Sequence, residues 1–279
     1  MRKSGSRKKP QGYKTVIAIL VAIILLQWLL IANLTKPKEK TKVLPPPKPV
    51  KVKPVVTPPS VKGKIAIVLD DWGYNEEDVA LASRIRYPLT MAVLPNLAYS
   101  KQVARELHKN GFQIILHFPM EPKEKRNLEK NTILSTMKQS TVKRILRESL
   151  LDVPHAQGIS NHMGSRITAD KNIMGYIIQE LKAQGLYFLD SYVSADSVCA
   201  QVAKQYQLKF AQRDIFLDNQ DDPAYIKNQL LKLQVKARIR GSAIGIGHDR
   251  KETLAVLREV MPSMEKEGFR FVFVSDLVK

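Results

Sequence analysis

The chain has 279 residues and a formal net charge of +19, and 44% of its residues are hydrophobic. Most of the excess positive charge lies before residue 63, and the rest of the chain has no stripe of interleaved basic and aromatic residues. The charge therefore does not indicate nucleic-acid binding, and we expect no such partner. The single cysteine, Cys199, excludes an intramolecular disulfide, and its small neighbours predict that it packs within a helix.

The N-terminal region predicts membrane attachment. Residues 1–15 form a basic segment, and residues 16–34 are apolar apart from Gln27 and Asn33. At about 1.5 Å per residue the apolar segment spans roughly 28 Å as a helix, enough to cross a bilayer. A cleavable signal peptide has a shorter apolar region and a small-residue cleavage site. We therefore predict an uncleaved, single-pass signal-anchor in an inner or plasma membrane. The preceding basic residues predict a cytoplasmic N-terminus and a periplasmic or extracellular C-terminal domain.

Residues 35–62 are rich in proline and lysine and have few large apolar side chains. This composition predicts a linker in extended polyproline II conformation, with a reach of roughly 85 Å. Residues 63–279 are long enough for one α/β domain with a full hydrophobic core.

Short apolar runs alternate with amphipathic helical stretches through this domain. Strands are predicted to begin at Lys64, Leu89, Phe112, Gln157, Leu186, Lys209, Ser242 and Phe269. Strands that alternate with helices indicate parallel pairing with right-handed crossovers. We predict a distorted (β/α) barrel of about seven or eight mostly parallel strands, with an open doubly wound sheet as the alternative.

Polar residues follow nearly every predicted strand, at the face where active sites of such folds assemble. They are Asp70-Asp71, Pro95-Asn96, His117, Asn161-His162, Asp190-Ser191, Asp218-Asn219, His248-Asp249 and Ser275-Asp276.

Three of these positions predict a metal centre. Asp71 or Asp70, together with His117 and His162, would form an open, zinc-like site with room for water. Adjacent carboxylates repel, and a cation or a shared proton would relieve them. Taken singly, the Asp pair also fits a helix cap and each histidine a core position. Their convergence on one face favours the metal centre. His248, which follows Gly247, suits proton transfer at the mouth of the site.

Four motifs together resemble the divergent polysaccharide deacetylases, and the resemblance covers residues 63–279. They are Leu69-Asp70-Asp71-Trp72-Gly73, Leu116-His117-Phe118-Pro119-Met120-Glu121-Pro122, Gly158-Ile159-Ser160-Asn161-His162-Met163-Gly164-Ser165 and Gly245-Ile246-Gly247-His248. This family is a branch of the wider carbohydrate esterase group that removes N-acetyl groups from chitin-like polymers and peptidoglycan. The resemblance implies a distorted (β/α) barrel and a divalent metal, most commonly zinc.

The resemblance also implies roles for individual residues. Asp70 corresponds to the general base, Asp71 to a metal ligand and His248 to the general acid. The group's usual pair of metal histidines, spaced H-x-x-x-H, is incomplete here, because His117 is followed four residues later by Glu121. Either Glu121 or the later His162 would complete the site. We favour His162, since Pro119 disfavours a helical pairing of His117 with Glu121.

The sequence thus predicts a membrane-anchored, metal-dependent N-deacetylase that acts on an acetylated envelope or extracellular polysaccharide such as peptidoglycan. The possible substrate groove comprises Asn161, Ser165, Arg166, Asp190 and Ser191, and Asp190 or Asp218 would orient His248 or bind sugar hydroxyls. The incomplete histidine pair leaves an alternative, a catalytically inactive domain that binds glycan or an envelope protein. A different metal hydrolase, for example one that acts on an ester, is a third hypothesis.

Overall fold

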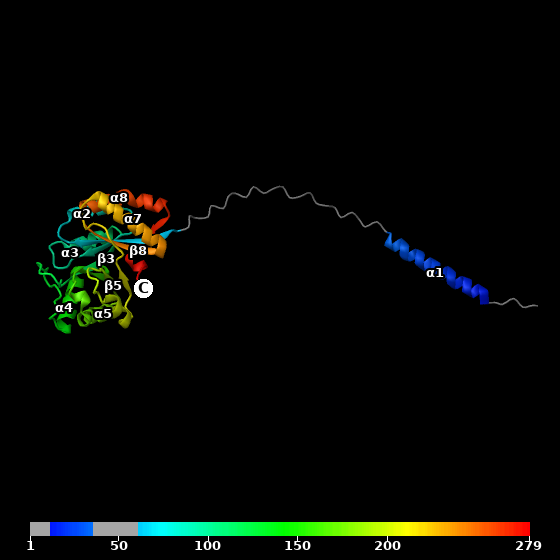
Figure 1. Ribbon diagram of the computed structural model, residues 1–279, viewed down its shortest axis with the longest axis horizontal. Coiled ribbons are helices and arrows are strands. Elements are labelled where there is room, and N and C mark those ends of the chain that lie inside the picture. Colours follow the sequence, from blue (N-terminus) through cyan, green and yellow to red (C-terminus); the bar gives the residue numbers. More distant parts are fainter. Residues whose placement is uncertain (1–11, 36–60) are drawn as a thin grey trace, which may run out of the picture. The chain divides into compact units, whose positions relative to one another are not determined.

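The computed structural model describes residues 12–35 and 61–279, and the chain divides into two compact units, Met1–Val56 and Thr57–Lys279. In the first unit, helix α1 (Gly12–Leu34) contains the apolar stretch Lys14–Leu34 (Figure 1). This helix is long and apolar enough to cross a membrane, but a signal sequence has the same properties. Anchoring and orientation therefore stay predictions. Most of the predicted basic segment and linker lies outside the described residues.

The second unit is built on one parallel sheet, with the strand order β6-β5-β4-β3-β2-β1-β8-β7 and with β9 paired to β1. The strands are β1 (Gly63–Trp72), β2 (Thr90–Val93), β3 (Gln113–Met120), β4 (Ala156–Met163), β5 (Tyr187–Asp190), β6 (Phe210–Gln212), β7 (Ile215–Phe216), β8 (Ser242–His248) and β9 (Phe269–Phe271). Although β6 and β7 stand at opposite ends of this order, only Arg213 and Asp214 separate them in the chain. The sheet must therefore curl until its ends approach, which confirms the distorted barrel.

Helices cover the outside of the curled sheet (Figure 1). They are α2 (Glu77–Ala82), α3 (Ser100–Lys109), α4 (Gln139–Asp152), α5 (Lys171–Ala183), α6 (Cys199–Tyr206), α7 (Pro223–Arg240) and α8 (Lys251–Lys266), with short 3-10 turns at Ile167–Ala169 and Val274–Asp276. Local sequence sets their ends. Asp222 accepts a hydrogen bond from the Tyr225 amide at the start of α7, and Gly241 ends that helix with φ +80°. Cys199 is buried at the start of α6, as its neighbours predict.

Two apolar clusters stabilise this unit. The larger cluster fills the space between sheet and helices, and the smaller one lies inside the curl, where alternate β1 residues Ala66 and Val68 meet residues of β2, β3, β5 and β8. Both clusters consist of residues after Gly63, within the second unit.

Residues 272–279 close the curl at the end where the strands begin. Val272 and Val274 are buried in the smaller cluster, and Lys279 exchanges two backbone hydrogen bonds with Phe210 of β6. Ser275 bonds to Gln113, the first residue of β3. The prediction that Ser275-Asp276 joins the strand-end face is therefore wrong. The reason is that β9 pairs only with the first residues of β1, so the chain after it stays at the opposite end of the barrel.

Candidate metal centre and active site

The end of β1 presents two consecutive carboxylates to one site, although neighbouring residues of a strand normally face opposite sides. Asp70 continues the inward-facing series of Ala66 and Val68 and pairs in register with His248 of β8. Asp71 would face outward in a regular strand. The pairing of β1 with β2 shifts register between Leu69 and Trp72, however, and Asp71 has φ +71°. Such an irregularity re-aims a side chain, which explains how both carboxylates reach the site.

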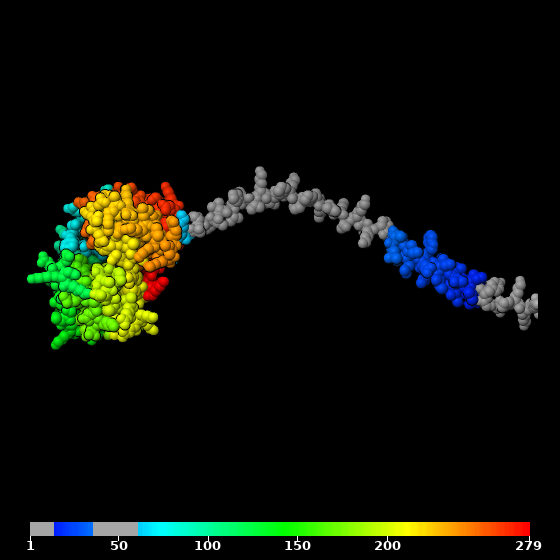
Figure 2. Space-filling view, viewed as in Figure 1, coloured from blue at the N-terminus to red at the C-terminus, as the bar shows by residue number. Residues whose placement is uncertain are grey.

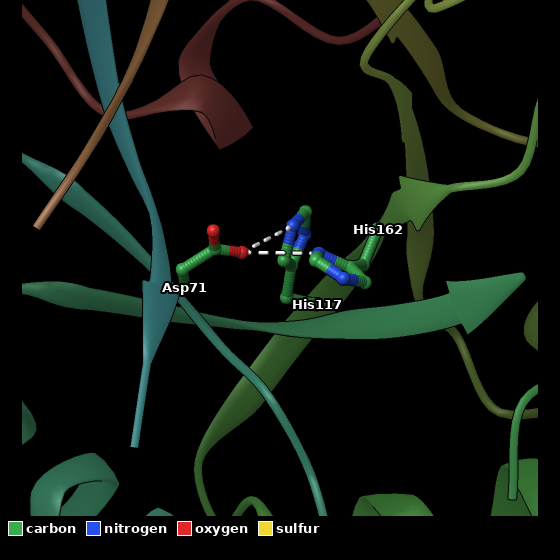
Figure 3. A group of neighbouring side chains, drawn as sticks. All are labelled: Asp71, His117 and His162. Atoms are coloured by element: carbon green, nitrogen blue, oxygen red, sulfur yellow. Dashed lines mark hydrogen bonds and ion pairs between the residues drawn. The ribbon is translucent and has the colours of Figure 1, made fainter. Parts of the chain in front are cut away.

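Strands β3 and β4 bring two histidines to Asp71. In their register His117 lies opposite Ser160, and Pro119 lies opposite His162. Asp71 Oδ1 is 3.3 Å from His117 Nε2 and 3.0 Å from His162 Nδ1 (Figure 3). One potential ligand atom from each of the three residues lies within 4.8 Å of the other two. The structure therefore brings together the three predicted metal ligands.

The donor set fits a divalent cation. Ligands bound at about 2.1 Å in a tetrahedral arrangement are about 3.4 Å apart, close to the Asp71–histidine separations. For His162 the ring atom near Asp71 is Nδ1, which makes Nδ1 the candidate ligand atom; its Nε2 is buried and has no hydrogen-bond partner among the described residues. His117 Nδ1 is 2.8 Å from the buried Ser160 hydroxyl, and a proton held there leaves the Nε2 lone pair free for a ligand bond.

The pKa values of His117 and Asp71 are both lowered, but for different reasons. Burial lowers the pKa of His117 to about 4, so its imidazole is neutral and can ligate a metal at neutral pH. Burial alone would raise the pKa of Asp71, but the neighbouring His117 and His162 imidazoles outweigh it and hold that pKa below its ordinary value.

Two further residues beside this cluster are suited to proton transfer. Asp70 is buried, and burial together with the neighbouring Asp71 charge raises its pKa well above the ordinary value. Its Oδ1 has no hydrogen-bond partner among the described residues. His248 Nε2 is 3.7 Å from Asp71, and its Nδ1 is 3.0 Å from the buried Asp218 carboxylate. Burial opposes the charged imidazole, but the Asp218 hydrogen bond outweighs it and raises the pKa of His248.

The predicted groove residues divide into two groups. Asn161 and Asp190 are buried, and their polar atoms bond to the chain itself, including the Ser191 and Tyr192 amides. They fix the loop after β5 rather than line an open groove. The Ser191 hydroxyl is also buried.

By contrast, Ser165 lines a pocket of about 250 Å³ next to the end of β4, and Arg166 lines a separate, more open pocket. Glu121 accepts hydrogen bonds from Ser135 and lies 3.2 Å from Arg166. It is absent from the metal cluster, which favours His162 over Glu121 as the third ligand.

Sequence reasoning missed two residues that brace the site. Ser160 lies within a quoted motif but received no role, because its contact with His117 depends on the register of β3 and β4. Arg213, between β6 and β7, bonds to the Ser191 and Tyr192 carbonyls, and its charge acts on Asp70. Arg213 follows no long apolar run, so no pattern in the sequence predicted that it lies beside the site.

A family profile described as divergent polysaccharide deacetylase matches residues 67–278. The chain therefore belongs to the divergent polysaccharide deacetylase family. It is similar to the uncharacterized protein YibQ of Escherichia coli (strain K12), with 35% identity over 203 residues, which are 73% of this chain and 64% of YibQ. An uncharacterized protein of Haemophilus influenzae is 33% identical over 207 residues, 74% of each chain. The chain thus spans less than two thirds of the length of YibQ.

The fold also resembles the crystal structure of the uncharacterized protein ATU2773 from Agrobacterium tumefaciens C58. The TM-score is 0.75 at 24% identity, and the match covers 80% of this chain and 91% of that one. At this identity the likeness establishes the fold alone.

Proposed function

We propose that the protein is a metal-dependent N-deacetylase acting on an acetylated polysaccharide of the cell envelope or the extracellular space. The observation that carries this proposal is the cluster of Asp71, His117 and His162 at the strand ends, with Asp70 and His248 beside it. The cluster supplies metal ligands, and the other two residues supply a base and an acid. Hydrolysis of an amide requires all three functions.

Zinc is the divalent ion that we propose, because two imidazoles and one carboxylate form an open catalytic zinc site in other hydrolases. When bound, such an ion polarises the acetamide carbonyl and acidifies water. Asp70 accepts the proton of the attacking water, and its raised pKa makes its carboxylate a stronger base. The amide C–N bond then breaks while His248 protonates the departing nitrogen. The products are acetate and a free amino sugar.

The partner of His248 is suited to this role. Asp218 accepts hydrogen bonds from His248 Nδ1, from the His248 amide and from the Thr253 hydroxyl. It therefore fixes the imidazole and favours its protonated form, and Nε2 remains on the side of Asp71. An imidazole that already carries a proton is ready to act as an acid.

The glycan would bind over the neighbouring loops. The pocket of about 250 Å³ lies at the end of β4 and is lined by residues from three loops, Pro122, Glu124, Arg126, Met163, Gly164, Ser165 and Val193. Tyr74 and Tyr192 are exposed on the loops after β1 and β5, and Tyr192 has φ +50°, fixed by hydrogen bonds of its backbone to Asp190 and Arg213. Exposed aromatic rings offer sugar rings a flat apolar surface.

Membrane attachment through α1, with a cytoplasmic N-terminus, is part of this proposal. It rests on the length and hydropathy of α1 and on the basic residues before it. It would place the domain outside the membrane, where envelope polysaccharides lie.

The test is the zinc content of residues 57–279 after reconstitution and dialysis. We expect about one tightly held zinc in the wild type, and loss of it in Asp71→Ala and His162→Ala. His108→Ala is the matched control, because His108 is an exposed histidine of α3 that stacks on His155, outside the cluster. No zinc in the wild type would contradict the hydrolase mechanism.

Acetate release from N-acetylated chitin oligomers and from peptidoglycan distinguishes the enzyme from the alternatives. Release that Asp70→Asn abolishes without loss of zinc supports the deacetylase. A zinc-loaded domain that binds glycan but releases no acetate would favour the inactive binding domain. Release from O-acetyl esters alone would indicate a different hydrolase.

A further inference from the structure

Helix α7 has a line of apolar side chains on its outer face, in addition to the face that packs on the sheet. Leu231, Val235 and Ile239 are 60%, 53% and 78% exposed, and their spacing of four residues places them along one side of the helix. We call these three residues the α7 stripe. On the other side, Leu230 and Leu233 are buried in the main cluster. A helix at a protein surface normally has a polar outer face, so the stripe needs a partner.

The charges on α7 point to the nature of this partner. Every charged residue of the helix is basic, and no acid occurs between Pro223 and Arg240. Lys227 pairs with Glu259, while Lys236 and Arg240 pair with Asp214. The exposed Lys232, adjacent to Leu231, has no acidic partner within 4.0 Å among the residues that the structure describes. Arg238 is exposed as well and lies over the Phe269 ring.

A second copy of the chain fits this face poorly. A symmetric contact through the stripe would place the basic residues of one copy against the same residues of the other, and the helix offers no acid to compensate. The surface of an anionic bilayer fits it well. A helix with an aliphatic face bordered by lysine and arginine binds at the boundary of headgroups and acyl chains.

The course of the chain gives a second reason. At the start of the domain, a Cβ built on Gly63 would lie 2.5 Å from the Ala237 carbonyl oxygen, and the Lys64 amide donates to the Gly241 carbonyl. The chain thus enters the domain at the C-terminal end of α7 (Figure 1). Residues before this point include α1, which is apolar enough to cross a membrane. A tethered domain has an effective concentration of the order of a millimolar, which makes even weak docking effective.

We propose that the outer face of α7 docks on an anionic lipid surface. Leu231, Val235 and Ile239 enter the headgroup boundary, and Lys232 and Arg238 face the lipid phosphates. The outer surface of the domain's α7 region, yellow to orange, is not covered by other elements in the space-filling view (Figure 2). This proposal concerns a face outside the candidate active site; its tether argument rests on the membrane attachment proposed above, and it does not depend on deacetylase activity.

The experiment is sedimentation of residues 57–279 with vesicles of phosphatidylcholine alone or mixed with phosphatidylglycerol. This fragment carries the entire sheet and both clusters, so we expect it to fold by itself, and circular dichroism of each variant checks this. We expect binding to the anionic vesicles that weakens with salt. Lys232→Ala should weaken it about fivefold, the contribution of one cation near such a surface. Joint replacement of the stripe by serine should weaken it by at least about tenfold.

Matched controls distinguish vesicle binding through the α7 face from non-specific binding by other exposed residues. Leu151→Ser removes an exposed leucine of α4, and Lys204→Ala removes an exposed lysine of α6. Both should bind vesicles as the wild type does. Equal losses in the controls, or no binding by the wild type, would overturn the proposal. A wild-type dimer in sedimentation equilibrium that is absent in the serine variant would also overturn it, because a second copy would then cover the stripe.

Discussion

Replacing Ser160 by alanine should weaken metal binding without any change to a ligand. The Ser160 hydroxyl is fully buried and lies 2.8 Å from His117 Nδ1. With a proton on Nδ1, His117 presents its Nε2 lone pair toward Asp71, 3.3 Å away. Without the hydroxyl, a proton on Nδ1 is unpaired in a buried site, and the ring instead favours a proton on Nε2, donated to Asp71. That tautomer cannot bind a metal through Nε2.

The size of the effect follows from these contacts. His117 is neutral at pH 7, because its pKa is about 4, so the lost hydrogen bond joins two neutral groups. Its loss leaves the buried His117 Nδ1 without a partner in either tautomer, which should lower the free energy of unfolding of the zinc-free domain by about 1–3 kcal/mol. Zinc affinity should fall by about 10–100-fold, the usual cost of removing a residue that orients a metal-bound histidine.

The matched control is Ser149→Ala. Ser149 is a buried serine of α4 whose hydroxyl has no hydrogen-bond partner among the described residues. Its replacement should leave the free energy of unfolding and the zinc affinity nearly unchanged. Urea denaturation measures the free energy of unfolding, and competition with a chromophoric zinc chelator measures the zinc affinity. If Ser160→Ala binds zinc as tightly as the Ser149→Ala control, the serine does not orient His117 and the reasoning is refuted.

Three other predictions follow from charges and packing. Asp218→Asn should lower the pKa of His248, so the alkaline limb of acetate release should shift to lower pH. An NMR titration of His248 checks the shift directly, and an unchanged limb would exclude His248 as the acid. The pKa of His117 is about 4 in the folded state and about 6.5 in the unfolded state, so as pH falls the unfolded state binds the proton first. The zinc-free domain should therefore lose stability as pH falls through this window, which urea denaturation at several pH values measures. Gly158→Ala should destabilise the domain by about 1–3 kcal/mol, because the new Cβ would lie 2.6 Å from a buried tyrosine ring. Gly175→Ala in α5, whose nearest contact would be 3.7 Å, should instead stabilise it by about 0.5–1 kcal/mol; equal effects would contradict the packing argument.

The fold could be predicted from the sequence because the strands β1, β3 and β8 are mostly apolar runs between turn residues. The predicted starts Lys64 and Phe112 lie within one residue of the observed starts of β1 and β3. The two-residue strand β7 (Ile215–Phe216) was missed, because so short a run has no periodicity to recognise. Its presence depends on pairing with β8, a tertiary interaction.

Only part of the candidate site could be predicted from the sequence, for a related reason. Residues at the carboxyl ends of strands, such as Asp71 and His162, can be assigned to one end of the barrel without knowledge of register. The contacts that brace them cannot. Ser160 reaches His117 only because β3 and β4 pair in one register, and Arg213 reaches the loop after β5 only because β6 pairs with β5, with Gln212 opposite Asp190. The roles of Asn161 and Asp190 were also beyond the sequence, since it does not show which polar side chains are buried.

The closure of the barrel by residues 272–279 has a consequence for biogenesis. The first strand of the sheet pairs with the last two, and the segment after β9 seals the interior. A ribosome or a translocation channel delivers the chain from its N-terminus, so β1 can pair early with β2 but must wait for its other two neighbours, β8 and β9. Until then its apolar residues remain accessible to chaperones and proteases. The domain should acquire protease resistance in one late step, after residue 279 has emerged, and not gradually as the chain lengthens.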